Sequence, residues 1–178
     1  MAVILVLGDT HIPRRANRIP DEIEEFVRGK PFDYVICTGD LTAESVLDYL
    51  RQLGRKVVAV RGNMDHLPLP EYAEITIGGF RIGVIHGDQV YPRGNREQLE
   101  DIAVERGVEV LISGHTHLPD VYKGRVVLLN PGSATGAWGG GGGSMRPSFM
   151  VVNVAGSEMV VELYELGKGV LTKRTFRF

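Results

Sequence analysis

The sequence has little cysteine, no long apolar run at its start and almost no net charge, and each of these absences excludes a class of protein. Its 178 residues include a single cysteine, Cys37, so it lacks the cysteine pairs of disulfides and the cysteine arrays of thiolate zinc sites. The apolar run at residues 2–7 is too short for a membrane span or a signal peptide. With 20 basic and 22 acidic residues, the formal charge of −2 argues against a protein that coats nucleic acid. We therefore expect a cytoplasmic protein that contacts no membrane and for which a nucleic-acid partner is not favoured.

Length and composition predict one domain over residues 1–178, because a chain of this size with 43% hydrophobic residues can build one buried core. Short apolar runs alternate with amphipathic segments near the N-terminus, a pattern typical of a parallel sheet covered by helices. Strands are expected at 2–7, 33–37, 57–60, 74–77, 81–85, 110–113, 126–129, 149–154, 159–164 and 170–176, and helices at 21–28, 43–53 and 95–106. The predicted fold class is α/β, with two facing mixed sheets and helices outside.

Turn and cap signals add local expectations. Thr42 is the expected N-cap of the second helix, and Gly54 its stop. Asn95 and Gln98 resemble a capping box at the start of the third helix. The pair at 78–79 is a two-residue glycine turn that predicts a hairpin.

Polar side chains that can bind metals follow the expected strands directly, in most cases after a glycine. The segments concerned are Gly8-Asp9-Thr10-His11, Gly39-Asp40, Gly62-Asn63, His86-Gly87 and Gly114-His115-Thr116-His117. Because ligands bind at the carboxyl ends of strands in open α/β sheets, these side chains are expected to share one site. In extended chain, residues two apart point to the same side, so Asp9 is expected to chelate with His11, and His115 with His117.

These motifs resemble, in type and order, the signature of the calcineurin-like metallophosphoesterases over residues 1 to about 133. The length and the segment 130–133 make the chain most similar to the small YfcE-like phosphodiesterases of bacteria and archaea. The resemblance implies a four-layer α/β/β/α sandwich. It also implies that Asp40 bridges two metal ions, the first held by Asp9, His11 and His117 and the second by Asn63, His86 and His115.

Such a ligand set suggests both the metals and the reaction. Imidazole and carboxylate without thiolate suit Mn²⁺, Ni²⁺, Fe²⁺, Co²⁺ or Zn²⁺ better than Mg²⁺, and manganese ranks first. Two such ions can activate a bridging hydroxide for in-line attack on phosphorus, with Asp40, Asn63 and His115 acting through the metals. The sequence thus predicts a dinuclear metal-dependent phosphodiesterase for a small phosphate ester.

Three questions about the reaction stay open. Many members of the wider family carry a histidine after the metal-binding asparagine, where it protonates the leaving group, but this chain has Met64. Asp65 or His66 could replace that acid, although the sequence favours an ordinary surface-loop residue over an acid at His66. Arg14 and Arg15 could grip the substrate phosphate or form a solvated pair.

Other functions and features also remain as alternatives. A nuclease would use the same chemistry, but no basic, aromatic-rich groove is evident. The retromer-subunit relatives keep this fold as protein-binding scaffolds with degraded metal sites, whereas all seven expected ligands occur here. A homo-oligomer is possible. The glycine-rich segment 136–143 is either an exposed connection or a functional lid.

Overall fold

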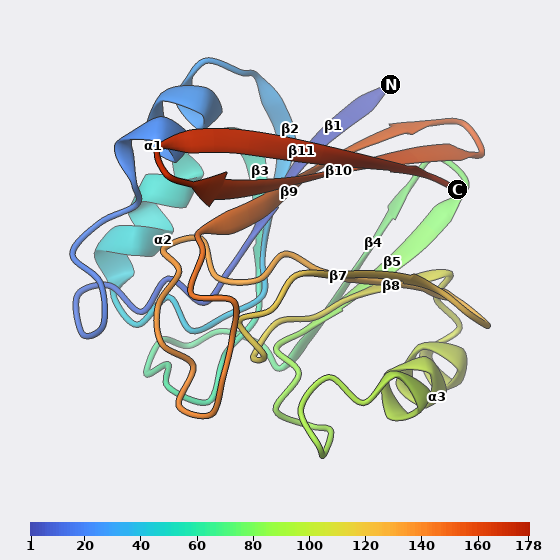
Figure 1. The fold of residues 1–178 in the computed structure, drawn as a ribbon. Helices are drawn as coiled ribbons and strands as arrows, with labels where there is room; N and C mark the ends of the chain where they lie inside the picture. Colours follow the sequence, from blue (N-terminus) through green and yellow to red (C-terminus); the bar gives the residue numbers. More distant parts are fainter.

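The computed structural model describes residues 1–178, in which two β-sheets face each other and helices cover their outer sides (Figure 1). One sheet has six strands in the order β11-β10-β9-β1-β2-β3, and the other has five in the order β4-β5-β6-β8-β7. The first sheet comprises β1 (Ala2–Leu7), β2 (Phe32–Cys37), β3 (Gly54–Ala59), β9 (Ser148–Ala155), β10 (Glu158–Gly167) and β11 (Val170–Arg177). The second comprises β4 (Tyr72–Ile77), β5 (Phe80–Ile85), β6 (Val110–Ile112), β7 (Asp120–Lys123) and β8 (Val127–Asn130). The helices are α1 (Asp21–Arg28), α2 (Glu44–Arg51) and α3 (Arg96–Arg106).

Three apolar clusters fill the spaces between the layers of the molecule. Ile4 and Val6 of β1 belong to the cluster between the two sheets. The alternating residues Leu5 and Leu7 pack instead with α1 and α2, because successive strand residues point to opposite faces. A third cluster, which includes Leu99, joins α3 to the second sheet. This order of layers confirms the expected four-layer α/β/β/α sandwich.

Each sheet contains three adjacent parallel strands, which direct their carboxyl ends to one end of the sandwich. Strands β1, β2 and β3 are parallel, as are β5, β6 and β8, while the remaining pairs are antiparallel. The residues just after these strands meet across the sheets. The His115 N–H donates to Asp9 Oδ2 across the sheets, and within the second sheet the Gly114 N–H donates to the His86 carbonyl. The loops at this end therefore form a single site.

Two predicted helix boundaries are wrong. Thr42 is not the N-cap of α2, because its φ is 66° and its hydroxyl donates to the Ile12 carbonyl; Ala43 holds the cap position without a side-chain bond. Gly54 does not stop α2, which ends earlier at Arg51, but begins β3. In both cases tertiary contacts override the local signal: Thr42 bonds the loops that carry Ile12 and Asp65, and Gly54 pairs with Phe32 of β2.

The capping box at α3 is only half formed. Asn95 Oδ1 accepts from the Gln98 N–H as expected. The Gln98 amide does not return to Asn95 and instead bonds the backbone of Tyr91 through both its oxygen and its nitrogen.

The 78–79 turn joins β4 and β5 as predicted, with Ile77 opposite Phe80. None of the helices has the length and apolar character needed to cross a lipid bilayer.

Candidate metal centre

Two groups of metal-competent side chains lie where the two sheets meet. Within each group the potential ligand atoms are all within 4.8 Å of one another. The first group contains Asp9, His11 and His117, and the second contains Asp40, His86 and His115. Apart from the half-buried His115, these side chains are buried.

The distances within each group are those of atoms that can share a cation. In the first, His11 Nε2 lies 3.2 Å from His117 Nε2, which in turn lies 3.6 Å from Asp9 Oδ1. In the second, His86 Nε2 lies 3.2 Å from Asp40 Oδ2. The amide oxygen of Asn63, from an exposed loop, lies 3.0 Å from the same His86 nitrogen. The structure therefore brings all seven residues singled out from the sequence to one place.

Asp40 lies between the two groups. Its Oδ2 is 3.2 Å from His86 Nε2 and 3.5 Å from His11 Nε2 of the other group. Its second oxygen accepts from the Met64 N–H at 2.8 Å. One carboxylate oxygen is thereby directed at both groups while the other is fixed by the backbone.

The local backbone differs from the extended chain expected at the motifs. Positive φ angles occur at Asp9 (50°), His11 (48°), Asp40 (53°), His115 (72°) and His117 (58°). This left-handed conformation is costly for residues with a Cβ, and it clusters at functional sites. The prediction that His115 and His117 chelate together is wrong, since the twisted backbone directs them into different groups. Asp9 and His11 do share a group, but not through an extended backbone.

Two of the glycines that precede the ligands allow close approach between the loops. A Cβ on Gly62 would overlap the Asp40 carboxylate, and one on Gly114 would lie 2.7 Å from Asp9 Oδ2. A larger residue at either position would displace a ligand.

Backbone carbonyls fix the orientation of two imidazoles. His86 Nδ1 lies 2.7 Å from the Thr38 carbonyl, and His117 Nδ1 lies 2.7 Å from the Ala137 carbonyl. Because a carbonyl can only accept, each Nδ1 must carry the proton. Each Nε2 is then directed into the centre, which is the usual arrangement behind metal-binding histidines.

Two buried side-chain oxygens, Asp9 Oδ1 and Thr38 Oγ1, have no hydrogen-bond partner, and a cation in the centre would satisfy the first. Asp9 Oδ1 is completely buried and makes no hydrogen bond. Burial raises the pKa of Asp9 to about 6, against the opposing effect of His86 and His117. An unpaired buried carboxylate oxygen is costly unless a positive charge compensates it. The imidazole, carboxylate and amide donors therefore fit two divalent cations.

The imidazoles of the centre differ in pKa, because burial and the neighbouring charges affect each of them to a different extent. Burial would lower the pKa of His86, but the hydrogen bond to Asp40 and the charges of Asp9 and Asp40 outweigh it and raise that pKa to about 9. Burial raises the pKa of Asp40, yet the His86 contacts prevail and the pKa falls below its usual value. Burial lowers the pKa of His11 and that of His115 to about 4. His86 is thus the imidazole whose protonated form the two aspartates favour, and a cation at its Nε2 would compete with a proton there.

Asp65 and His66, the two candidate acids, occupy different environments. Asp65 is buried and its carboxylate accepts three backbone N–H groups at 2.8 Å, from Asp40, Thr42 and Gly62. This geometry favours a structural role for Asp65, because both oxygens are engaged in holding the metal-binding loops. His66 is exposed and shares a hollow of about 480 Å³ with Asn63.

Of the two candidate phosphate-binding arginines, only Arg15 is held near the centre. Its N–H donates to the His11 carbonyl, and its guanidinium donates to the Trp138 carbonyl at 2.8 Å. Arg14 is exposed and makes no hydrogen bond or ion pair. Sequence reasoning missed Arg93, which lies near His115, because no motif marks it.

Comparison with known proteins identifies the family. Residues 1–157 match the calcineurin-like phosphoesterase superfamily domain. The chain belongs to this superfamily. A probable metallophosphoesterase of Methanocaldococcus jannaschii is 49% identical over 135 residues, which are 75% of this chain and 68% of the relative. The predicted family is therefore confirmed, and with it the expectation of a metal-binding hydrolase fold.

Solved structures of the superfamily with the same architecture include Vps29 proteins. A single mutant of Vps29 from Entamoeba histolytica is 38% identical and superposes with a TM-score of 0.94 over 99% of both chains. Wild-type Vps29 of the same organism, solved as a complex with zinc, is 36% identical with a TM-score of 0.89 over 98% of both chains. Calcineurin-like phosphoesterase architecture thus extends over the full length of this chain.

Proposed function

We propose that this chain is a dinuclear metal-dependent phosphodiesterase that hydrolyses a small phosphate ester. The position of Asp40 carries the proposal, because its Oδ2 lies within 3.5 Å of imidazole nitrogens from both ligand groups. Membership of the superfamily supports phosphoester hydrolysis. The choice of a diester follows the resemblance to the YfcE-like phosphodiesterases.

The seven residues of the centre would act as ligands of two metal ions. Two bound divalent ions would lower the pKa of coordinated water and neutralise charge on a phosphoryl group. Asp9, His11 and His117 would hold one ion, Asn63, His86 and His115 the other, and Asp40 both. Manganese ranks first among the candidates, before nickel, iron, cobalt and zinc.

We propose His66 as the proton donor to the leaving group. Met64 cannot donate a proton from its thioether, and Asp65 is occupied by backbone N–H groups. His66 lines the polar hollow beside Asn63 and is free to reach a leaving oxygen there.

A protein-binding scaffold is the second candidate function, and the similarity to Vps29 supports it. Binding of metal alone does not separate the two functions, since one Vps29 structure is a zinc complex. The separation requires a measurement of turnover.

Replacement of the shared carboxylate tests the enzymatic function. In chain reloaded with Mn²⁺ after chelation, Asp40→Ala should lower kcat/KM on bis(p-nitrophenyl) phosphate by more than about a thousandfold, or ~4 kcal/mol of transition-state stabilisation. Asp101→Ala, which removes an exposed carboxylate of α3 paired with Arg125, should leave it unchanged. If Asp40→Ala were as active as wild type, the role assigned to Asp40 in a dinuclear centre would be overturned. If metal-loaded wild type hydrolysed no phosphate ester, the result would favour the protein-binding scaffold.

A further inference from the structure

The glycine-rich segment Gly136–Gly143, here called the strap, lies directly against the metal centre. Three successive carbonyls of the strap accept hydrogen bonds from cationic or metal-competent side chains. These bonds run from His117 Nδ1 to the Ala137 carbonyl, from Arg15 Nη1 to the Trp138 carbonyl and from Arg93 Nη1 to the Gly139 carbonyl. The strap is therefore anchored to the centre, and is not merely an exposed connection.

The glycines of the strap allow it to pack on His117. A Cβ at Gly139 would lie 3.1 Å from His117 Cγ, and one at Gly143 would lie 2.8 Å from His117 Cβ. Gly142 has a φ of +147°, a conformation that residues with side chains rarely adopt. Packing against His117 thus explains the glycines at 139 and 143, and the backbone conformation explains the glycine at 142.

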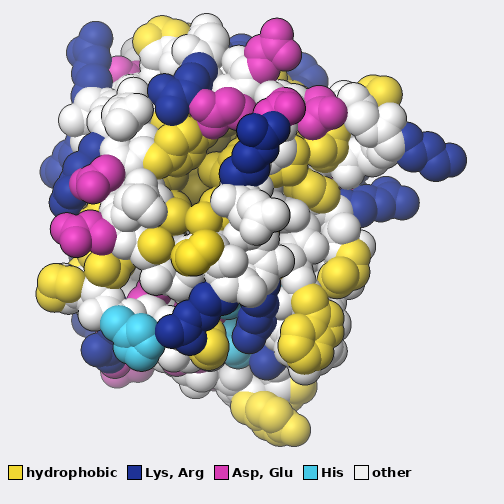
Figure 2. All heavy atoms as spheres, turned by 90° about the vertical axis from the view of Figure 1, so that its left-hand side faces the viewer, with side chains coloured by type: hydrophobic (Ala, Val, Ile, Leu, Met, Phe, Trp, Pro, Cys, Tyr) yellow, Lys and Arg dark blue, Asp and Glu magenta, His cyan; other side chains and the backbone are white.

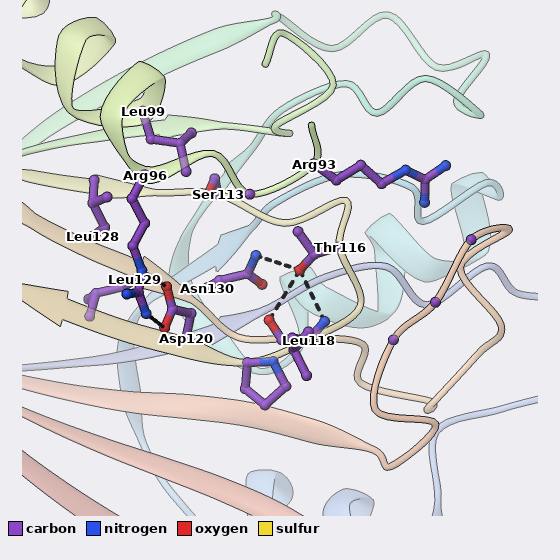
Figure 3. Close-up of a pocket in the computed structure, with 15 residues that line it drawn as sticks. Arg93, Arg96, Leu99, Ser113, Thr116, Leu118, Asp120, Leu128, Leu129 and Asn130 are labelled. Carbon is purple, nitrogen blue, oxygen red and sulfur yellow. Dashed lines mark hydrogen bonds and ion pairs between the residues drawn. The ribbon is translucent and has the colours of Figure 1, made fainter. Parts of the chain in front are cut away.

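The two arginines approach the strap from opposite sheets. Arg15 follows β1 and bonds the backbone of His11, and Arg93 follows β5. Figure 3 shows Arg93 extending away from Asn130 and Thr116 toward the strap. Arg15 is thus held beside the first ligand group, and both guanidinium groups bond the strap that packs on His117.

Both guanidinium groups have neutral partners only. Arg18 and Arg96 pair with the carboxylates of Asp21 and Asp120, whereas Arg15 and Arg93 bond carbonyls and have no acidic partner. Guanidinium hydrogen bonds to an anion are roughly twice as strong as those to a neutral acceptor. An anion at the centre would therefore compete with the carbonyls for both groups. Figure 2 shows basic side chains beside the histidines that reach this part of the surface.

We propose that Arg15 and Arg93 form a two-sided clamp for the phosphoryl group, and that they exchange the strap carbonyls for phosphoryl oxygens when the ester binds. Loss of the two anchoring bonds loosens the strap next to the site, so the substrate opens its own access route. The inference rests on the proposed phosphoesterase function, because that function places a phosphoryl group between the two arginines.

Binding of inorganic phosphate to Mn²⁺-loaded protein, measured by equilibrium dialysis, tests the clamp without turnover. Arg15→Met and Arg93→Met should each weaken phosphate binding by about ten- to a hundredfold, the effect of one charged hydrogen-bonding partner, with bound manganese unchanged. Arg55→Met is the matched control, because Arg55 is exposed and lies on β3 at the end of the strand remote from the centre. Arg15→Lys and Arg93→Lys should recover only part of the affinity, since lysine lacks the two-pronged geometry.

The emission of Trp138 reports on the strap itself, because Trp138 is the only tryptophan of the chain. Trp138 is 58% exposed, and its ring centroid lies 5.5 Å from the Arg15 guanidinium carbon. Phosphate should change the emission of wild type saturably, with the dissociation constant found by dialysis. Binding without any change in emission would contradict the exchange of partners.

The outcomes separate this inference from the proposed function. Equal phosphate affinity in wild type, Arg15→Met and Arg93→Met would overturn the clamp even if the enzyme hydrolyses diesters. Failure of metal-loaded wild type to bind phosphate would overturn it as well. Arginine-dependent phosphate binding in a chain that hydrolyses no ester would support the clamp and reject the phosphodiesterase.

Discussion

The ligand residues show both what a sequence can reveal about a site and what it cannot. Their types and order, each after a short apolar run, were sufficient to predict a shared centre. The conformation was not predictable, because a left-handed backbone at Asp9 or Asp40 has no local sequence signal when glycine is absent. Such strain persists only when surrounding contacts impose it, as the bonds from the Asp40 and Thr42 N–H groups to the Asp65 carboxylate do.

Asp65→Asn tests whether Asp65 is structural or acidic. The amide would face one of the three N–H donors with an N–H of its own, so the free energy of unfolding should fall by about 1–3 kcal/mol. Urea denaturation of the metal-free protein measures this change. Activity on alkyl and nitrophenyl esters should decline in equal proportion. Unchanged stability with a selective loss on alkyl esters would show that Asp65 is the general acid.

The secondary-structure elements were predicted where their own apolar periodicity is strong and missed where tertiary contacts decide. The core strands and all three helices lie where the sequence places them, with ends shifted by a few residues. The edge strand β7 (Asp120–Lys123) was missed because it has only four residues, is only partly buried and has a charged residue at each end. It exists through pairing with β8, which no local pattern encodes.

Helix α3 offers a direct measure of one predicted local interaction. Asn95 Oδ1 accepts from the Gln98 N–H at 3.0 Å, and no other side chain caps this end. Asn95→Ala should therefore lower the free energy of unfolding by about 1 kcal/mol. Asn95→Asp, which retains the acceptor and suits the helix dipole, should stay within about 0.5 kcal/mol of wild type. Equal losses in both variants would assign the effect to packing instead of the cap.

At the scale of the molecule, the centre depends on pairings far apart in the sequence. Each ligand group draws on both sheets, with Asp9 and His11 facing His117, and Asp40 facing His86 and His115. The strap adds contacts between residues 15 and 138 and between 93 and 139. The sequence predicted the strap only as a loop, because its glycines carry no side chain to signal a partner. Family resemblance supplied the grouping of ligands that local geometry could not.

The central claim is that two cations act together in this centre, and a metal titration tests it most directly. Metal-free chain is loaded with increasing Mn²⁺, and bound metal per chain is measured alongside the hydrolysis of bis(p-nitrophenyl) phosphate. Because Asp40 is directed at both ligand groups, we expect activity to rise mainly with the second bound equivalent and to stop rising at two. Full activity at one bound equivalent, or none at two, would contradict the account.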